Sequence, residues 1–121
     1  MLNDRITLTK ADASAQNYDA VKKFPTSTVR SDATRDLDQP QTITVSHEET
    51  RDGKRRNSVI LLDKVVLDAG DLVTLGTARL QFKASFDKQQ ITFADLLEMK
   101  DQMVELLNSP DFFTKFSNQE H

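Results

Sequence analysis

Residues 78–86 show the clearest strand pattern in this chain, and a helix pattern follows after a short polar turn. Period-2 alternation of this kind is typical of a strand with one buried and one open face. The apolar set is Leu80, Phe82, Ala84 and Phe86, and the polar set is Arg79, Gln81, Lys83 and Ser85. The open face is therefore basic and polar, as on a sheet that meets nucleic acid or on any solvated sheet.

The helix pattern begins at Thr92 and ends at Asn108. Thr92 and Asp95 have the spacing of a capping box, and proline at position 110 is tolerated as the first residue of a second helix. An apolar stripe, interrupted by Lys100, consists of Phe93, Leu96, Leu97, Met103, Val104 and Leu107. The second helix carries Phe112, Phe113 and Phe116. A tail with this much apolar surface must dock on something.

Upstream, short stretches of alternating or β-rich sequence predict further strands. They cover residues 5–10, 18–24, 26–30, 41–50, 57–67 and 72–75. Asp52-Gly53 predicts a hairpin turn and Ala69-Gly70-Asp71 the next turn, and Gly76-Thr77 connects to the last strand. We expect one α+β domain over residues 1–121. Residues 1–25 form an N-terminal hairpin, 26–87 a five-stranded antiparallel meander, and 91–118 two C-terminal helices.

Composition limits the possible functions. Only 37% of the 121 residues are hydrophobic, which favours a lean core and an oligomer. The net charge of -3 argues against a general nucleic-acid or membrane binder, so any basic surface must be local. The chain has no cysteine and no apolar N-terminal run typical of a signal peptide.

Residues for enzyme chemistry are few. His47 falls on the apolar side of its strand, which favours a structural role, and His121 is terminal. Asp32, Asp36 and Asp38 offer oxygen ligands for calcium, but we favour a solvated loop over a calcium site here. We therefore predict no enzyme, no cofactor and no metal site.

Polar side chains also follow the strand at residues 41–50. Its polar side carries Thr42, Thr44, Ser46 and Glu48, and its apolar side Ile43, Val45 and His47. A basic cluster surrounds the Asp52-Gly53 turn: Arg51, Lys54, Arg55 and Arg56. The cluster is a solvated hairpin tip or a phosphate contact.

This order of elements resembles the coat proteins of single-stranded RNA bacteriophages, the levivirus group. The resemblance is strongest over residues 42–86 and in the helix from Thr92. It implies that two subunits join final strands into one ten-stranded sheet, with helices reaching over the partner's sheet. Dimers then close into an icosahedral shell, assembled in the cytoplasm of the bacterial host. The polar sheet face meets the genomic RNA inside the virion.

The resemblance also implies roles for residues. The RNA-contacting positions on the two clearest strands are Thr42, Thr44, Ser46, Arg79, Gln81 and Lys83. For residues 57–67, a two-residue turn pairs Ser46 with Val59. A three-residue turn pairs it with Ser58 and places Arg56, Ser58 and Lys64 on the RNA face. We favour the three-residue turn because it supplies polar groups there. The implied dimer interface is Leu80, Phe82, Phe93, Leu97, Val104, Phe112, Phe113 and Phe116.

The implied partners are a second copy of the chain and single-stranded RNA, with no membrane and no small-molecule substrate. The alternative is a small acidic dimeric module, similar to a secretion chaperone, whose open sheet holds a protein partner and which has no capsid role.

Overall fold

The computed structural model describes residues 2–36, 39–67 and 74–119. Its contacts divide the chain into two units, Met1–Phe86 and Asp87–His121, which are described separately. The first unit contains β1 (Arg5–Thr9), β2 (Ala15–Lys23), β3 (Ser27–Ser31), β4 (Gln41–Glu49), β5 (Arg55–Leu67) and β6 (Thr74–Asp87). The second contains α1 (Phe93–Asn108) and α2 (Pro110–Ser117).

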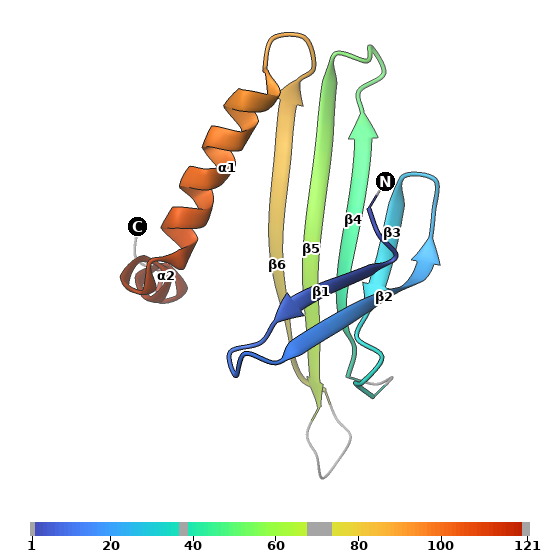
Figure 1. Cartoon of the computed structure of the whole chain (residues 1–121), viewed down its shortest axis with the longest axis vertical. Helices are drawn as coiled ribbons and strands as arrows, with labels where there is room; N and C mark the ends of the chain where they lie inside the picture. Colours follow the sequence, from blue (N-terminus) through green and yellow to red (C-terminus); the bar gives the residue numbers. More distant parts are fainter. Residues whose placement is uncertain (1, 37–38, 68–73, 120–121) are drawn as a thin grey trace. The chain divides into compact units, whose positions relative to one another are not determined.

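The six strands form one sheet in chain order, from β1 to β6 (Figure 1). The predicted α+β class, the N-terminal hairpin and the two C-terminal helices are confirmed. The predicted separate strand at residues 72–75 is wrong in its described part, because Thr74 and Leu75 already belong to β6. Four strands, not five, therefore follow the hairpin. The turn predicted at residues 69–71 lies outside the described residues.

Gly76 explains the error. A glycine between two apolar stretches predicts a turn, but Gly76 and Thr77 lie inside β6. Gly53 is the only described glycine with a positive φ, at +69°. An extended glycine is compatible with a strand, although it weakens one.

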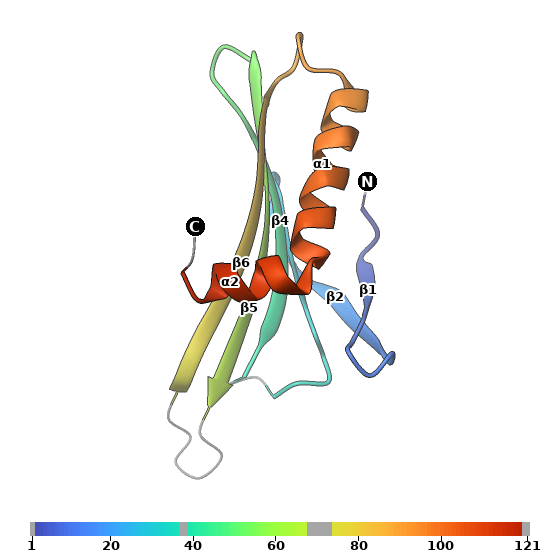
Figure 2. The ribbon, with the colours of Figure 1, turned by 90° about the vertical axis from the view of Figure 1, so that its left-hand side faces the viewer.

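The β1–β2 hairpin crosses one side of the sheet obliquely (Figures 1 and 2). Its second strand pairs with β3 only from Asp19 to Lys23, and the register shifts between Ala20 and Lys22. A bulge of this kind bends a strand and strengthens its twist. The hairpin thereby turns away from the plane of β3–β6 and covers part of one face.

The core of this unit lies beneath the hairpin. Tyr18 on β2 and Ile43 on β4 are buried, with exposed fractions of 1% and 6%. The Gln41 side-chain amide donates a hydrogen bond of 2.8 Å to the Tyr18 hydroxyl, so the buried phenol is satisfied. Arg30 and Asp32 are buried as well. The hairpin thus closes the β2–β4 part of the sheet.

A tight turn joins β4 to β5. The N–H of Gly53 donates to the Thr50 carbonyl, and the Asp52 carboxylate accepts from the Thr50 hydroxyl and the Lys54 N–H. The positive φ of Gly53 favours glycine at this position. The resulting register places Ser46 opposite Val59. The three-residue turn that we favoured, which pairs Ser46 with Ser58, is therefore wrong.

The helices of the second unit begin and end as predicted. Thr92 and Asp95 form a complete capping box at the start of α1. The Ser109 hydroxyl accepts from the Phe112 N–H, and Pro110 is the first residue of α2. Neither helix in the described residues is long and apolar enough to cross a membrane.

Candidate nucleic-acid interface

Opposite residues of antiparallel strands point to the same face of a sheet, so the registers assign each side chain to a face. We call the side that bears Thr42, Thr44 and Ser46 the polar face. We call the side that bears Ile43, Val45 and His47 the hairpin face, because the β1–β2 hairpin covers part of it. On β5, the residues opposite the polar side of β4 are Asn57, Val59, Leu61 and Asp63.

The strand β6 presents its basic side to the polar face. The Arg79 guanidinium contacts the Asp63 carboxylate through two hydrogen bonds, of 2.6 and 3.1 Å. Farther along the same two strands, Arg55 donates to the Ser85 hydroxyl at 3.2 Å. Both contacts place the Arg79–Ser85 set on the side of Thr42. The structure therefore brings together the predicted residues Thr42, Thr44, Ser46, Arg79, Gln81 and Lys83.

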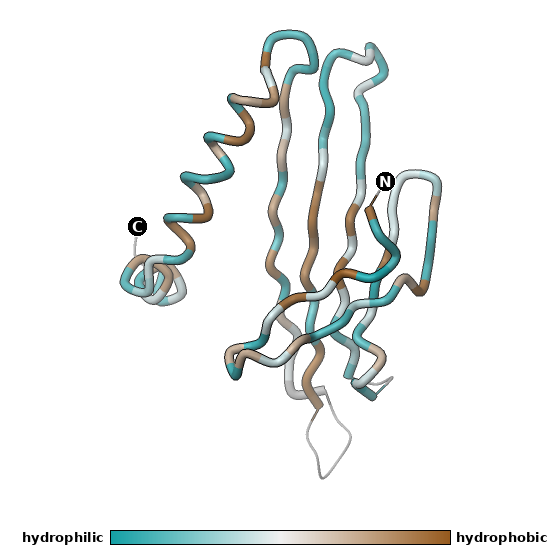
Figure 3. Tube along the Cα trace, in the orientation of Figure 1, coloured by the Kyte–Doolittle hydropathy of each residue, from teal (hydrophilic) through white to brown (hydrophobic). Residues whose placement is uncertain are grey.

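Three predicted residues lie elsewhere. Arg56 is opposite Glu49, Ser58 opposite His47, and Lys64 opposite Gln41, all on the hairpin face. The predicted placement of these three residues on the RNA face is therefore wrong. The central residues of β5 are apolar almost throughout (Figure 3), so hydrophobicity carries no period-2 signal from which to read the phase.

The register places on the polar face two residues outside the predicted RNA-binding set, of which only Arg55 was named from the sequence, as part of the basic cluster. Arg55 lies at the start of β5, and Asn57 lies opposite Glu48. The only sequence signal for this placement was the alternative two-residue turn, which pairs Ser46 with Val59. The basic cluster at the hairpin tip is thus divided, because Arg55 faces Ser85 whereas Arg56 pairs with Glu49 at 2.9 Å on the other side.

The two cations that β6 places on the polar face differ in how free they are to bind a phosphate. Hydrogen bonding to Asp63, and then the charge of this carboxylate, raise the pKa of the Arg79 guanidinium. Lys83 is exposed and has no ion-pair partner within the described residues. Its ammonium is therefore free for a phosphate, while Arg79 must first leave or share Asp63.

Hydroxyl, amide and cationic groups on one sheet face can donate to phosphate, sugar and base edges. Val59 and Leu61, half-buried between them, add apolar surface. The face therefore suits single-stranded nucleic acid better than a catalytic reaction, which needs a positioned acid, base or nucleophile.

The described residues contain no group of three or more potential metal ligands, while Asp38 and His121 lie outside them. Asp32 instead accepts hydrogen bonds from Thr34 and Gln16. His47 lies on the hairpin face as predicted, with Nδ1 2.8 Å from the Ser58 hydroxyl.

Solved structures match this fold over nearly the whole chain. The bacteriophage EMS014 coat protein has a TM-score of 0.78 and 14% identity, covering 99% of this chain and 98% of that one. The virus-like particle of Beihai levi-like virus 21 has a TM-score of 0.83 and 10% identity, covering 100% and 98%. The chain has the fold of single-stranded RNA bacteriophage coat proteins.

The coat-protein fold also matches a structure described as an unassembled virus coat protein dimer and a bacteriophage RNA-binding dimer. Its TM-score is 0.68 at 13% identity, covering 97% of this chain and 94% of that one. No family model and no curated protein matches the sequence. The matched structures are virion proteins and not enzymes, as we predicted, and they do not favour the secretion-chaperone alternative.

Proposed function

We propose that this chain is a capsid protein that forms dimers, assembles into an icosahedral shell and packages single-stranded RNA on the polar face. The virion is its location, after assembly in the bacterial cytoplasm. The observation that supports this most is a coat-protein fold that extends over nearly the whole chain. The proposed dimer and the proposed RNA binding are argued from surfaces that a single copy of the chain leaves exposed.

The dimer is supported by exposed apolar side chains. Phe93, Phe116 and Leu80 are 78%, 59% and 58% exposed, and neither helix contains a buried residue. The other expected interface residues are also exposed: Phe82, Leu97, Val104, Phe112 and Phe113. A large exposed apolar surface marks an interaction site. Permanent interfaces of this kind often bury more than about 2,000 Å².

The edge strand β6 is the second support for a dimer. It ends the order of the sheet and spans Thr74–Asp87. A long edge strand with free N–H and C=O groups is a template for pairing with another chain. Pairing of β6 with its copy would join two six-stranded sheets, giving twelve strands instead of the ten expected.

The RNA-binding role rests on the polar face as corrected by the register. Its proposed contacts are Thr42, Thr44, Ser46, Arg55, Asn57, Arg79, Gln81 and Lys83. The cations neutralise phosphates and the hydroxyl and amide groups donate to sugar or bases. Local basic groups make this possible in a chain with a net charge of -3.

Particle size tests the proposal directly. The expressed chain should elute at megadalton size, appear as shells by electron microscopy and carry nucleic-acid absorbance. Phe113→Ala, which removes an interface ring, serves as the matched variant and should yield fewer shells. A wild-type chain that remains a dimer and captures a polypeptide, without forming shells, would contradict the capsid role.

A further inference from the structure

Arg30 on β3 is a buried cation without a carboxylate partner in the described part of the chain. The side chain is 3% exposed. Its Nε and Nη2 both donate to one neutral acceptor, the Asn3 carbonyl, at 3.1 and 2.8 Å. Its Nη1 is buried and makes no hydrogen bond to any described residue. Buried charges are normally paired, because leaving water costs much more than a neutral acceptor returns.

The neighbouring acid does not fill this role. Asp4 follows Asn3 in the chain, but its carboxylate contacts the Lys23 ammonium at 2.7 Å. That pair is exposed, with side-chain exposures of 61% for Lys23 and 72% for Asp4. The Arg30 charge is the smallest of the causes that lower the pKa of the Asp4 carboxyl group, after those from Lys23, so no carboxylate among the described residues hydrogen-bonds the buried guanidinium.

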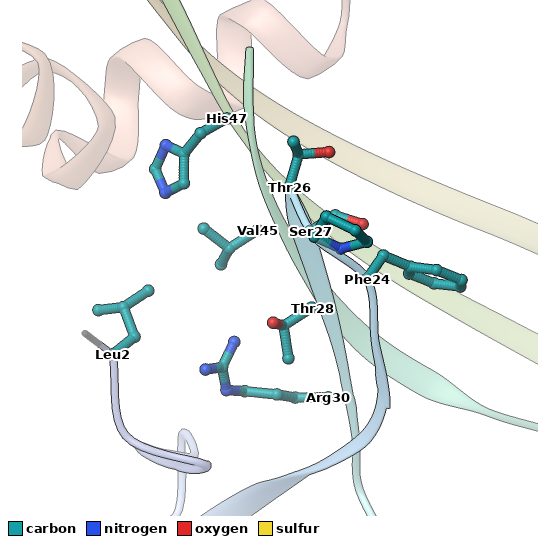
Figure 4. Close-up of a pocket in the computed structure, with 9 residues that line it drawn as sticks. Leu2, Phe24, Thr26, Ser27, Thr28, Arg30, Val45 and His47 are labelled. Atoms are coloured by element: carbon teal, nitrogen blue, oxygen red, sulfur yellow. The ribbon is translucent and has the colours of Figure 1, made fainter.

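A cavity of about 320 Å³ lies beside Arg30 on the hairpin face. Figure 4 shows the guanidinium turned toward the space between Leu2, Thr28 and Val45, with His47 farther along the same side. The walls are partly apolar, while Arg30 supplies the charge and Thr28 a hydroxyl. This combination suits a carboxylate carried on an otherwise apolar element, since Arg binds carboxylates in a planar, bidentate manner.

The helix α1 is such an element. It carries an apolar stripe and no buried residue. Asp101 comes four residues after Leu97 and three before Val104, so it borders this stripe. Its carboxylate contacts the Lys100 ammonium at 2.8 Å in an exposed pair, which contributes little to stability and can open on docking. Glu98 and Glu105 are neighbours of Asp101 at helical spacing but lie farther from the stripe, whereas Asp95 is occupied in the capping box. A second copy that packs the apolar stripe of its α1 against a sheet face would also bring these carboxylates close to that face.

We infer that a second copy of the chain completes the Arg30 cavity with a carboxylate from its α1, supplied by Glu98, Asp101 or Glu105. This rests on the proposed dimer. Charge complementarity favours this occupant, because Glu98, Asp101 and Glu105 outnumber the one cation of α1, Lys100, and meet a face that holds Arg30 and Lys64. Ile60 and Phe82 are exposed apolar residues of the same face, and the apolar stripe of the second copy's α1 would cover them.

Double-mutant cycles on the soluble dimer test the pairing. Arg30→Met is combined in turn with Glu98→Gln, Asp101→Asn and Glu105→Gln, and sedimentation gives each dimer dissociation constant. One acid should couple to Arg30 by about tenfold or more, as close interfacial charge pairs do. Asp111→Asn on α2, whose carboxylate contacts Lys115 at 3.3 Å, is the control and should be additive. Arg30→Lys, which retains the charge, replaces Arg30→Met if that variant does not fold.

Mixed dimers show whether the carboxylate comes from the other copy. An Arg30→Met chain mixed with the chain lacking the coupled acid restores one complete pair only if the contact crosses the interface. The mixed dimer should then exceed its statistical share by on the order of tenfold in the exchange equilibrium. Statistical mixing would place the carboxylate in the same chain and overturn the inference.

Other outcomes also decide the question. Additivity with all three acids, in a wild-type chain that does dimerise, would overturn the inference and leave the proposed function intact. An Arg30→Met dimer that binds RNA with a flatter salt dependence would assign the cavity to a phosphate instead. A wild-type chain that stays monomeric would overturn both the dimer and the completed cavity.

Discussion

The two ends of the sheet differ in how much of their apolar surface the chain itself covers. At the β2–β4 end, Tyr18 and Ile43 are buried at 1% and 6% exposure. At the β5–β6 end, Ile60 and Leu80 are 44% and 58% exposed. The first region is covered by a hairpin that is adjacent in the chain. The second keeps its apolar residues exposed in a single copy of the chain, and the proposed dimer would cover them.

Polar contacts follow the same division. The Asp32 carboxylate and the Tyr18 hydroxyl are satisfied by Gln16, Thr34 and Gln41 in the closed region. In the open region, the Arg79–Asp63 pair has side-chain exposures of 61% and 28%. Exposed ion pairs contribute about 0–1 kcal/mol, so they do not replace apolar burial. Closure of this fold is therefore uneven along the sheet.

The largest expected effect is in the closed region. Tyr18→Ala removes a fully buried ring and should cost about 3–5 kcal/mol in the free energy of unfolding. Tyr18→Phe is the matched control and should lose only about 0.5–1.5 kcal/mol, the value of a hydrogen bond. Both are measured by denaturant unfolding at one fixed protomer concentration. A small loss for Tyr18→Ala would mean that the hairpin does not close this region.

The open region and the helices of the second unit should respond through association, because the proposed dimer covers both. Phe113→Ala should weaken the dimer by about 2–4 kcal/mol, because buried aromatic residues dominate interfaces. Sedimentation over a dilution series measures the dissociation constant, and wild type diluted to nanomolar concentration should yield no stable folded monomer. If Phe113→Ala dissociates as wild type does, the α2 phenylalanines are not part of the interface.

Acid should destabilise the closed region through Asp32. Hydrogen bonds from the Thr34 and Gln16 side chains lower the pKa of its carboxyl group from 3.8 to about 2. A depressed pKa in the folded state stabilises above the unfolded pKa, and this contribution is lost as the pH falls from about 4 to about 2.

The measurement compares wild type with Asp32→Asn. The variant should be less stable by about 2 kcal/mol at pH 7, and the difference should shrink toward pH 2. Denaturant unfolding at a series of pH values gives both numbers. A difference that stays constant across this range would show that the ionised carboxylate is not what stabilises the loop.

The smallest expected effect is on the salt dependence of RNA binding. It shows whether the cations that contact RNA lie in the open region or in the closed region. Lys83→Ala on β6 should flatten the log–log salt dependence of RNA binding by about 0.7–0.9, the value of one phosphate contact on a single or double strand. Arg79→Ala should flatten it less, because Asp63 already engages the guanidinium. Lys22→Ala, on β2 of the hairpin and opposite Val29, is the control for a general loss of charge.

Filter binding or fluorescence titration of soluble dimers across a salt series provides the slopes, with sedimentation to verify dimerisation. Equal slopes for wild type and Lys83→Ala would remove Lys83 from the RNA contacts. An effect of Lys22→Ala as large as that of Lys83→Ala would extend the contact surface to the closed region.

Local sequence signals alone determined much of this fold. The alternation at residues 78–86 predicted most of β6, and Thr92, Asp95 and Pro110 located both helices. These features depend on neighbours within one turn or one strand, so short-range stereochemistry is sufficient. The polar groups of β4 and β6 on one face also followed from alternation, and the contact of Arg79 with Asp63 supports that grouping.

The phase of β5 and the surroundings of the charged residues depend on pairing between segments that are distant in the chain. Residues 59–62 in the middle of the strand are all apolar, so they permit either register, and the Asp52-Gly53 turn selects the one that moves Arg56, Ser58 and Lys64 to the hairpin face. The burial of Arg30 likewise depends on Asn3, which is 27 residues away in the chain. Such pairings arise where distant segments meet, because a residue's partner across a sheet depends on chain geometry and not on its own type.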